Sequence, residues 1–571
     1  MTDRPTTPQP RHSQAPTNSS EAEMIEERTA YAKHRWYVLL GLLALAAVAF
    51  FCGLGTLALL GPDEPRYAEV AREMFATGDY LSPRLCGCLW FEKPALFYWL
   101  AAGSYRIFGV GEFAARVPSA LAATLTALFL GRVLWRSGST RLGVAVPLVL
   151  MSSGLFIGYA RAATPDMLLA ASMTAAIISG HFVAIANEDA SRLKWLLLCA
   201  AAAALSVLAK GLVGVVLLVP ILGLYFAITG NLRSVRWQAC AAALAVFLIV
   251  SASWYLPVTI KHGWAFIDQF FIDHHFRRYV SNRFSHRQPF YFYPALAVYG
   301  VAPWSFFLIA AAVRIRRLRP RRDHRDSLLT LSWIWVAVPI IFYSFSASKL
   351  PGYILPVFPA LAIIIAAEVE RLWRGEWTRG QNGVAWLTAL LLVGLGAGYA
   401  LYLRREGVDE SGWRVALVWL PLAVALMSVG LLAASKRRVF TLGLAAVVAA
   451  VIIGTTTLLF PKVNDQWSLR LLSRKAAAAL QPDEKIGFFI YKEFAPVFYA
   501  EGRVECGYPE GDILNALHQD RLVAALEKES SLVVITLERW QDDLEDDGRF
   551  DMEFIDSQGE ALAYRVKLKK R

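Results

Sequence analysis

Two short polar segments interrupt the apolar sequence with side chains that could take part in phosphate or acid–base chemistry. The segment KLPGY at residues 349–353 places an ammonium group and a phenol between two apolar stretches. The segment DEPRY at residues 63–67 directly follows another apolar stretch, far upstream. Charged side chains are costly beside lipid, so their presence usually marks a functional site. If both segments open on the same side of a membrane, they can contribute to one site.

The composition of the chain indicates a membrane protein with a soluble appendage. Of its 571 residues, 56% are hydrophobic and only 18% are charged. About 20 apolar residues are needed for each membrane-spanning helix. The first long apolar stretch, 37–60, is too long for a signal peptide, so we expect a permanent anchor. Residues 1–36 before it are polar, Pro-rich and Ser-rich in their first thirty positions, and are predicted to form a disordered cytoplasmic N-terminus.

The basic character of the chain is a topology signal rather than a nucleic-acid footprint. The net charge is +12, and residues 314–325 (RIRRLRPRRDHR) contain seven arginines directly after an apolar stretch. Lys and Arg are enriched in the cytoplasmic loops of membrane proteins. We therefore expect the lipid bilayer, and no nucleic acid, as the surroundings of this chain.

Apolar stretch length predicts about thirteen spans within residues 37–460. These are 37–60, 113–135, 142–160, 166–186, 195–209, 211–229, 238–257, 290–313, 327–346, 353–367, 384–403, 413–433 and 439–460. With the N-terminus inside, every inner connection carries Lys or Arg, as the positive-inside rule requires. The outer connections are then 61–112, 161–165, the vicinity of Lys210, 258–289, 347–352, 404–412 and the C-terminal 461–571.

The outer connections hold nearly all the candidate site residues, which predicts an active site facing the periplasm. That side has no nucleotide triphosphate pool, and the chain contains no G-x-x-x-x-G-K-[ST] loop. Any group transfer there must use a donor that is already activated and carried across the membrane. A lipid-linked phosphosugar meets that requirement.

Four residues of the first large outer loop are candidates for this chemistry. Asp63 is either a helix N-cap with a Pro in the first turn or a functional carboxylate, with Arg66 and Tyr67 on the same helix face. Lys93, next to Glu92, is either an interfacial cation or a ligand for a lipid phosphate.

Two further outer connections carry polar candidates. Asp166, in the string RAATPD, is again either an N-cap or an acid of the site. The loop 258–289 contains FIDHHFRRY, with His274, His275 and Arg278, and then HRQPFY. These side chains could cradle phosphate, bind a metal ion, or lie at the headgroup boundary, where aromatic and basic residues are common.

The string DEPRYAEVAREMFATGDYLSPRLCGCLWFEKPALFYW resembles the first outer loop of bacterial aminoarabinose transferases, lipid-linked-sugar glycosyltransferases related to the protein O-mannosyltransferases of the GT-C superfamily. The resemblance continues in ARAATPDMLLAA, FFIDHHFRRY, HRQPFYFY and SKLPGYILPVFPALA, and covers residues 60 to 367. Cys86-Gly-Cys88 is not part of the family pattern. The fold implied is an α-helical polytopic membrane protein of GT-C type with a small C-terminal periplasmic α/β domain.

The resemblance also implies roles for individual residues. Asp63 matches the principal acidic residue of the family, and Asp166 matches the second outer-loop acid. The residues associated with the donor phosphate are Lys93, Arg278, Lys349 and Tyr353, to which Arg66 is added. Glu92 and His275 match positions implicated in metal binding or loop bridging, so a divalent metal is a candidate cofactor.

The function implied is transfer of a sugar from undecaprenyl phosphate, at the bacterial inner membrane, to a periplasm-facing acceptor. The best specific expectation is 4-amino-4-deoxy-L-arabinose transferred to lipid A. Asp63 would act as general base for a hydroxyl acceptor, whereas a phosphate acceptor is already ionised and needs no base.

The alternatives are mannosyl or other glycosyl transfer to protein or surface glycan, and, from another class, a secondary transporter. Transport is disfavoured because the polar residues gather on one side rather than at the midplane.

The C-terminal segment 461–571 alternates helical and extended patterns, which predicts a small periplasmic α/β domain. Helices are expected at 467–480 and 512–529, and strands at 485–491, 531–537 and 561–568. No catalytic constellation is apparent in this segment, and acceptor binding or shielding of the site are candidate roles. A disulfide from Cys86 or Cys88 to Cys506 is an open alternative to free thiols.

Overall fold

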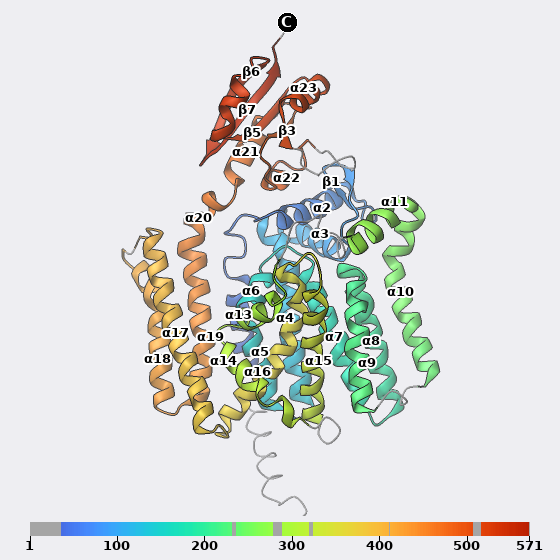
Figure 1. Cartoon of the computed structure of the whole chain (residues 1–571), viewed down its shortest axis with the longest axis vertical. Coiled ribbons are helices and arrows are strands. Elements are labelled where there is room, and N and C mark those ends of the chain that lie inside the picture. Colours follow the sequence, from blue (N-terminus) through green and yellow to red (C-terminus); the bar gives the residue numbers. More distant parts are fainter. Residues whose placement is uncertain are drawn as a thin grey trace, which may run out of the picture.

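The computed structural model describes residues 36–230, 236–277, 288–318, 324–409, 411–505 and 516–569. Its lower part is a bundle of long apolar helices, and its upper part is a small α/β domain that contains the C-terminus (Figure 1). Between them lie short helices from the loop that follows the first apolar helix. The candidate site residues are held at this middle level, where the bundle meets the upper domain.

The bundle is helical because a backbone surrounded by lipid must satisfy its own hydrogen bonds. It begins with the helix Trp36–Phe51. Its remaining helices are α4 (Glu112–Arg136), α5 (Thr140–Met151), α6 (Gly154–Ala160), α7 (Asp166–Ile185), α8 (Asp189–Lys210), α9 (Val213–Thr229), α10 (Trp237–His262), α13 (Phe292–Gly300), α14 (Ser305–Ala312), α15 (His324–Ser344), α16 (Phe358–Trp373), α17 (Arg379–Arg405), α18 (Arg414–Ala433) and α19 (Arg437–Gly454).

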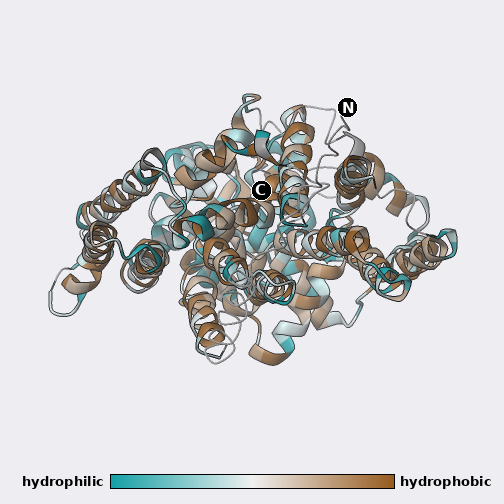
Figure 2. Cartoon of the chain, turned by 90° about the horizontal axis from the view of Figure 1, so that it is seen from below, coloured by the Kyte–Doolittle hydropathy of each residue, from teal (hydrophilic) through white to brown (hydrophobic). Residues whose placement is uncertain are grey.

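Within the described residues, nine helices are long and apolar enough to cross a membrane, or up to eleven if each of two bent pairs is one span. Two further apolar helices, Trp36–Phe51 and α9, are shorter. Each of the thirteen segments predicted from sequence coincides with one of these helices or pairs. The number of crossings itself stays a prediction. Hydrophobic residues line the periphery of the bundle when it is viewed from below (Figure 2).

Two predicted boundaries are wrong. The first helix ends at Phe51 rather than near residue 60, because the following residues form turns and Gly53 has a φ of 58°. A Cβ at Gly53 would lie 2.6 Å from Cβ of Thr456, so the close approach also requires glycine. The KLPGY segment does not start a regular α-helix. A 3₁₀ helix, Pro351–Val357, precedes α16.

Two predicted spans are broken, and their breaks contact each other. The pair α5 and α6 is bent by 70°, and the pair α13 and α14 by 119°. The second break contains Pro303, which removes a backbone donor and favours an interruption. The backbone N–H of Gly154 donates to the carbonyl of Ala302 (3.2 Å), and the indole of Trp304 donates to Oγ of Ser152 (2.9 Å). The first of these bonds uses backbone groups at the two breaks, where helices leave such groups without partners.

The first outer loop folds over the bundle as two short helices and a hairpin. α2 (Asp63–Thr77) and α3 (Leu96–Phe108) pack against each other, and the antiparallel strands β1 (Arg84–Leu85) and β2 (Cys88–Leu89) lie between them in sequence. The later outer loop contributes α11 (Trp264–Ile267) and the π-helix Asp268–Arg277.

The C-terminal domain contains a five-stranded mixed sheet with the strand order β4-β3-β5-β7-β6. Its strands are β3 (Lys485–Phe489), β4 (Ala516–Leu517), β5 (Leu532–Leu537), β6 (Phe550–Gln558) and β7 (Ala561–Leu568). Its helices are α21 (Arg470–Ala479), α22 (Ala495–Tyr499), α23 (Gln519–Lys528) and α24 (Gln541–Glu545). α20 (Phe460–Trp467) continues the apolar segment Arg437–Asn464 of the bundle and leads into this domain. The three strands expected from sequence are confirmed as β3, β5 and β7. β6 was missed because it is a largely exposed edge strand with polar residues on most positions.

The C-terminal domain is attached to the first outer loop and the bundle through polar contacts. The hydroxyl of Tyr499 accepts a hydrogen bond from the backbone N–H of Leu59 (3.0 Å) and donates to Glu112 (3.1 Å). Arg470 donates to the same carboxylate (3.3 Å), and Arg72 of α2 donates to the carbonyl of Glu501 (2.8 Å). These bonds place the C-terminal domain directly over α2, which carries Asp63.

A buried ion pair fixes α2 to the bundle. The carboxylate of Glu64 accepts bonds from Nε and Nη2 of Arg116 (2.9 and 2.8 Å) and from the backbone N–H groups of Leu60 and Ala163 (2.9 and 2.8 Å). Burial alone would raise the pKa of Glu64, but the Arg116 guanidinium and these donors lower it below its usual value. Because Glu64, next to Asp63, joins the first outer loop to α4 and to the connection that contains Ala163, this pair positions the candidate site.

Glu64→Ala should destabilise the protein by about 3–5 kcal/mol, because it leaves the charge of Arg116 buried without its partner. Thermal unfolding of the purified protein in detergent would measure the loss. Glu188→Ala, at an exposed position, is a matched control that should unfold like the wild type. Unchanged unfolding of Glu64→Ala would contradict this structural role.

Candidate active site

The first cluster of the candidate site lies at the start of α2. Asp63 is 46% exposed, and its Oδ1 lies 2.5 Å from Nη2 of Arg66. Nη1 of Arg66 lies 3.5 Å from Oε2 of the buried Glu92, and the ammonium group of Lys93 donates to Oε1 of Glu92 (2.7 Å). Two cations and two carboxylates therefore form one chain of ion pairs, which leaves the Asp63 carboxylate at its exposed end.

The interpretation of Asp63 as a helix cap is wrong. The N-cap position is Pro62, Asp63 is the first residue of α2, and no side chain caps this helix end. Tyr67 follows Arg66 on this helix, and its ring lies 5.9 Å from the guanidinium carbon of Arg66. The ring is buried and also packs on Phe97 and Tyr98. Burial raises the pKa of the Tyr67 phenol well above its usual value.

The C-terminal domain contributes an aromatic side chain to this cluster. The ring of Phe494 lies 5.2 Å from the guanidinium carbon of Arg66, within the range of a cation–π contact. The backbone N–H of Phe494 is in turn bonded to the carboxylate of Glu493 (2.9 Å). Phe494 could not be predicted as a site residue from the sequence, because a single aromatic residue carries no motif.

The second cluster joins three connections that are far apart in the sequence. The ammonium group of Lys210, at the end of α8, forms a short ion pair with Oδ1 of Asp166, at the start of α7. The same ammonium lies 5.2 Å from the centre of the Tyr353 ring. The N-cap of α7 is Pro165 and no side chain caps it, so the cap interpretation of Asp166 is wrong as well. The structure thus brings Asp166 and Tyr353 together, as predicted, and adds Lys210.

Lys210 was missed as a site residue, although its connection was correctly assigned to the same side as the other candidates. The signal in the sequence was weak, because Lys210 is a single lysine between two apolar stretches. A charge at such a position is costly unless it is paired with an opposite charge or has a function. The pairing with Asp166 explains its presence.

Gly352 of KLPGY allows the second cluster to pack closely. A Cβ added at this position would lie 2.7 Å from Oδ1 of Asp166 and 2.8 Å from the hydroxyl of Tyr159. The hydroxyl of Tyr159 therefore lies next to the second cluster.

Lys349 is a buried cation that has no carboxylate partner among the described residues. Its side chain is 8% exposed, and its ammonium group donates to the carbonyl of Ser346 (2.8 Å). The carbonyl of Leu350 accepts a bond from Tyr293 (3.3 Å), which fixes the same connection. Lys93 and Lys210, by contrast, are both neutralised by acids. A buried cation without a counter-ion favours a bound anion.

The side chains of three candidate residues, His274, His275 and Arg278, are not described. Arg278 lies outside the described residues altogether. In the described part of the chain, no three His, Cys, Asp or Glu side chains gather in a way that could hold a metal ion. Glu92 is engaged by Arg66 and Lys93. The metal and the roles of Arg278 and His275 stay predictions, as does a disulfide to Cys506, which is also outside the described residues.

Gly352→Ala should lower the rate of the reaction catalysed at this site, for which sugar transfer is expected, by about 10–100-fold. The added methyl group would displace Asp166 or Tyr159 from its position. Steady-state kinetics of the purified variant would measure this change. Gly158→Ala is the control, since a Cβ there meets no atom within 4 Å. Wild-type kinetics for Gly352→Ala would show that the close packing of this cluster does not matter for activity.

Comparisons with known proteins agree on the class of protein that this fold and site define. Residues 92–255 match the family model of dolichyl-phosphate-mannose-protein mannosyltransferases. The crystal structure of ArnT from Cupriavidus metallidurans bound to undecaprenyl phosphate is similar over 93% of this chain and 98% of that one, with a TM-score of 0.76 and 23% identity. The fold is therefore that of the GT-C type, in a multi-pass membrane protein.

The chain belongs to the family of undecaprenyl phosphate-α-4-amino-4-deoxy-L-arabinose arabinosyl transferases. It is 30% identical over 408 residues to the second such transferase of Pseudomonas fluorescens, an alignment that covers 69% of this chain and 71% of that one. The transferase of Aeromonas hydrophila is also 30% identical, over 63% of this chain. The chain spans slightly less than two thirds of the length of that relative, at 66%.

Proposed function

We propose that the chain is a glycosyltransferase of the inner membrane that takes a sugar from undecaprenyl phosphate at the periplasmic face. The observation that carries the proposal is the buried, acid-free ammonium of Lys349 beside the Asp166–Lys210–Tyr353 cluster. Among the described residues that were predicted to bind the donor phosphate, Arg66 and Lys93 are paired with carboxylates. Lys349 is not paired with a carboxylate in this part of the chain and is therefore suited to the donor phosphate.

In the proposed reaction, an oxygen of the acceptor attacks the anomeric carbon of the sugar. The bond from that carbon to the donor phosphate oxygen breaks, and undecaprenyl phosphate leaves with the electron pair. A direct displacement inverts the anomeric centre. Lys349 stabilises the charge that develops on the leaving phosphate, which is the type of interaction that most often dominates catalysis. Arg66 and the half-exposed Asp63 lie where the sugar or the acceptor is expected to bind.

The specific sugar is taken from the names of the relatives, and the acceptor is the one expected from the resemblance noted in the sequence. Several are called arabinosyl transferases of undecaprenyl phosphate-α-4-amino-4-deoxy-L-arabinose. We therefore assign 4-amino-4-deoxy-L-arabinose as the sugar and a phosphate of lipid A as the acceptor. A carboxylate such as Asp63 is suited to an amino sugar, whose ammonium group is a strong donor to an ionised acid.

Mannosyl transfer to protein is the second candidate, because residues 92–255 match the mannosyltransferase model. A secondary transporter is disfavoured, because Asp63, Asp166, Lys210 and Lys349 gather at the connections above the bundle rather than midway along its helices.

Mass spectrometry of lipid A and of envelope proteins from a deletion strain would separate these functions. Our proposal predicts loss of an aminopentose from lipid A, with restoration by the wild-type gene but not by a Lys349→Met copy expressed at the same level. Unchanged lipid A together with loss of a hexose from envelope proteins would favour the mannosyltransferase instead.

A further inference from the structure

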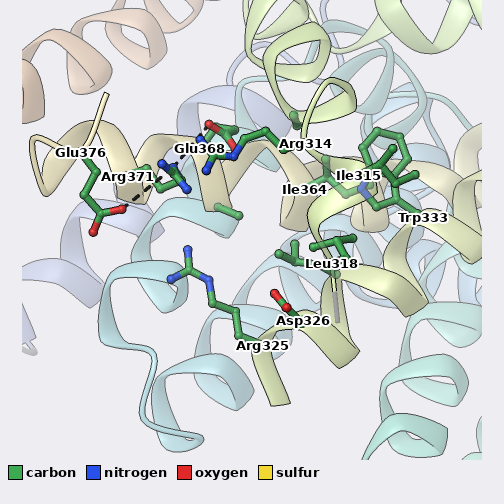
Figure 3. Close-up of a pocket in the computed structure, with 13 residues that line it drawn as sticks. Arg314, Ile315, Leu318, Arg325, Asp326, Trp333, Ile364, Glu368, Arg371 and Glu376 are labelled. Carbon is green, nitrogen blue, oxygen red and sulfur yellow. Dashed lines mark ion pairs between the residues drawn. The ribbon is translucent and has the colours of Figure 1, made fainter. Parts of the chain in front are cut away.

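A cavity of about 270 Å³ lies at the opposite end of the bundle from the candidate active site (Figure 3). It is formed by the end of α14, the 3₁₀ turn Ile315–Arg317, the first turns of α15 and the last turns of α16. Lys349 follows the far end of α15, which has 21 residues. At 1.5 Å per residue, the cavity and Lys349 are therefore separated by roughly 30 Å.

The cavity contains buried polar groups whose hydrogen-bonding capacity is not used. Glu368 is 4% exposed, and its Oε2 has no hydrogen-bond partner among the described residues. The same is true of Nε of Arg371. These two atoms lie 3.9 Å apart, and Nε of Arg314 lies 3.6 Å from Oε1 of Glu368, so the charges attract each other without a hydrogen bond. Leaving such groups unsatisfied is costly, which points to a ligand with both a donor and an acceptor.

Among the described residues that line the cavity, positive and negative side chains are equal in number. Three arginines (Arg314, Arg325, Arg371) face three acids (Asp326, Glu368, Glu376). Figure 3 shows Arg314, Glu368 and Arg371 together on one side of the space, with Arg325 and Asp326 on another. A lining without net charge favours a ligand that carries one charge of each sign over a purely anionic ligand. Guanidinium groups suit a phosphate, and the buried carboxylate suits an ammonium group.

The remaining wall is apolar and reaches the surface of the bundle. It includes Leu318, Leu329, Trp333 and Ile315, of which Ile315 is 43% exposed. The sequence around residues 314–325 is rich in arginine, as is typical of the cytoplasmic membrane surface, where basic pockets between helices bind lipid headgroups. A cavity of this size holds a headgroup, while acyl chains would lie along the apolar helix surface outside it.

We propose that this cavity binds the headgroup of a zwitterionic glycerophospholipid with a primary amine. The lipid phosphate is bound by the guanidinium groups of Arg314 and Arg371. The lipid ammonium group donates to the carboxylate of Glu368, and the acyl chains lie against the wall that contains Leu329 and Trp333.

Native mass spectrometry of the purified full-length protein tests the proposal. Phosphatidylethanolamine, phosphatidylcholine and phosphatidylglycerol with identical acyl chains are added at equal concentration, and bound lipid is measured at matched collision energy. The wild type should retain phosphatidylethanolamine about ten-fold more strongly than phosphatidylcholine, which has the same net charge but no N–H to donate to Glu368. This comparison requires no variant and is therefore independent of folding. Equal retention of the two lipids, or preference for phosphatidylglycerol, would overturn the proposal.

A pair of matched substitutions assigns the binding to this cavity. Glu368→Gln should reduce the retention of phosphatidylethanolamine to the level of phosphatidylcholine. Glu188→Gln, the same change at an exposed position on the same end of the bundle, should not. Glycerophosphoethanolamine, which has the headgroup but no acyl chains, should bind much more weakly than the lipid. Full retention by Glu368→Gln, or equal binding of the chain-free headgroup, would refute a lipid site at this position.

Discussion

Lys349→Met should lower the rate of sugar transfer by about 10²–10³-fold, with little change in thermal stability. Removal of one donor to a developing anionic charge typically has an effect of this size. Stability should be preserved because, in the described structure, the ammonium group is buried without a carboxylate partner and donates to the carbonyl of Ser346. Methionine retains the apolar part of the side chain.

The measurement is transfer by the purified variant at limiting and at saturating donor. Lys436→Met, at an exposed position in another connection, is the matched control and should behave like the wild type. If Lys349→Met kept full activity at limiting donor, Lys349 would have no role in phosphate binding. A fall in activity accompanied by unfolding would identify it as a structural residue instead.

Asp63→Asn should show what kind of acceptor the enzyme uses. It preserves the shape of the side chain and removes its charge and basicity. If the acceptor is a hydroxyl group, loss of the general base should lower kcat by about 10²–10⁴-fold at every donor concentration. If the acceptor is a phosphate, no proton has to be removed, and the variant should bind the amino sugar less tightly.

Our account predicts the second result, in which a higher donor concentration restores part of the rate. Donor is varied at saturating acceptor, and kcat and KM are compared with those of the wild type. Asp79→Asn, in the same outer loop, is a control for loss of a carboxylate outside the cluster. A fall in kcat that excess donor does not relieve would contradict a phosphate acceptor. Full activity would exclude Asp63 from both roles.

The sequence located most of the candidate site because charge is rare in the apolar segments. Asp63, Asp166 and Lys349 stand next to apolar stretches, where a charge is costly without a function or a partner. Counting spans then placed these residues on one side, and the structure brings Asp166 next to Gly352 and Tyr353. The spacing of Asp63 and Arg66 correctly predicted their contact on one helix face.

The pairing of charges was not predictable from the sequence. Lys93 and Lys349 appeared equivalent as phosphate ligands, but only Lys93 is neutralised by an acid within the described residues. The difference depends on which carboxylates lie nearby in three dimensions. Phe494 illustrates the same limit, because its contact with Arg66 exists only once the C-terminal domain is docked on α2.

Local backbone geometry set a further limit. The apolar pattern continues through residues 52–60, yet the helix ends at Phe51, because Gly53 adopts a positive φ and packs on Thr456. In the same way, hydropathy predicts one span where α13 and α14 are bent by 119°. The apolar pattern of the sequence indicates which residues are buried away from water. It does not indicate where tertiary contacts interrupt a helix.

The most direct test of the central claim is reconstituted transfer, with the purified protein, synthetic undecaprenyl-phosphate aminoarabinose and lipid A in the same vesicles. The product is analysed by mass spectrometry. We expect lipid A to gain one aminopentose with the wild type and to gain almost none with Lys349→Met. Unmodified lipid A with the active wild-type protein, together with sugar transfer to a protein acceptor under the same conditions, would contradict the account.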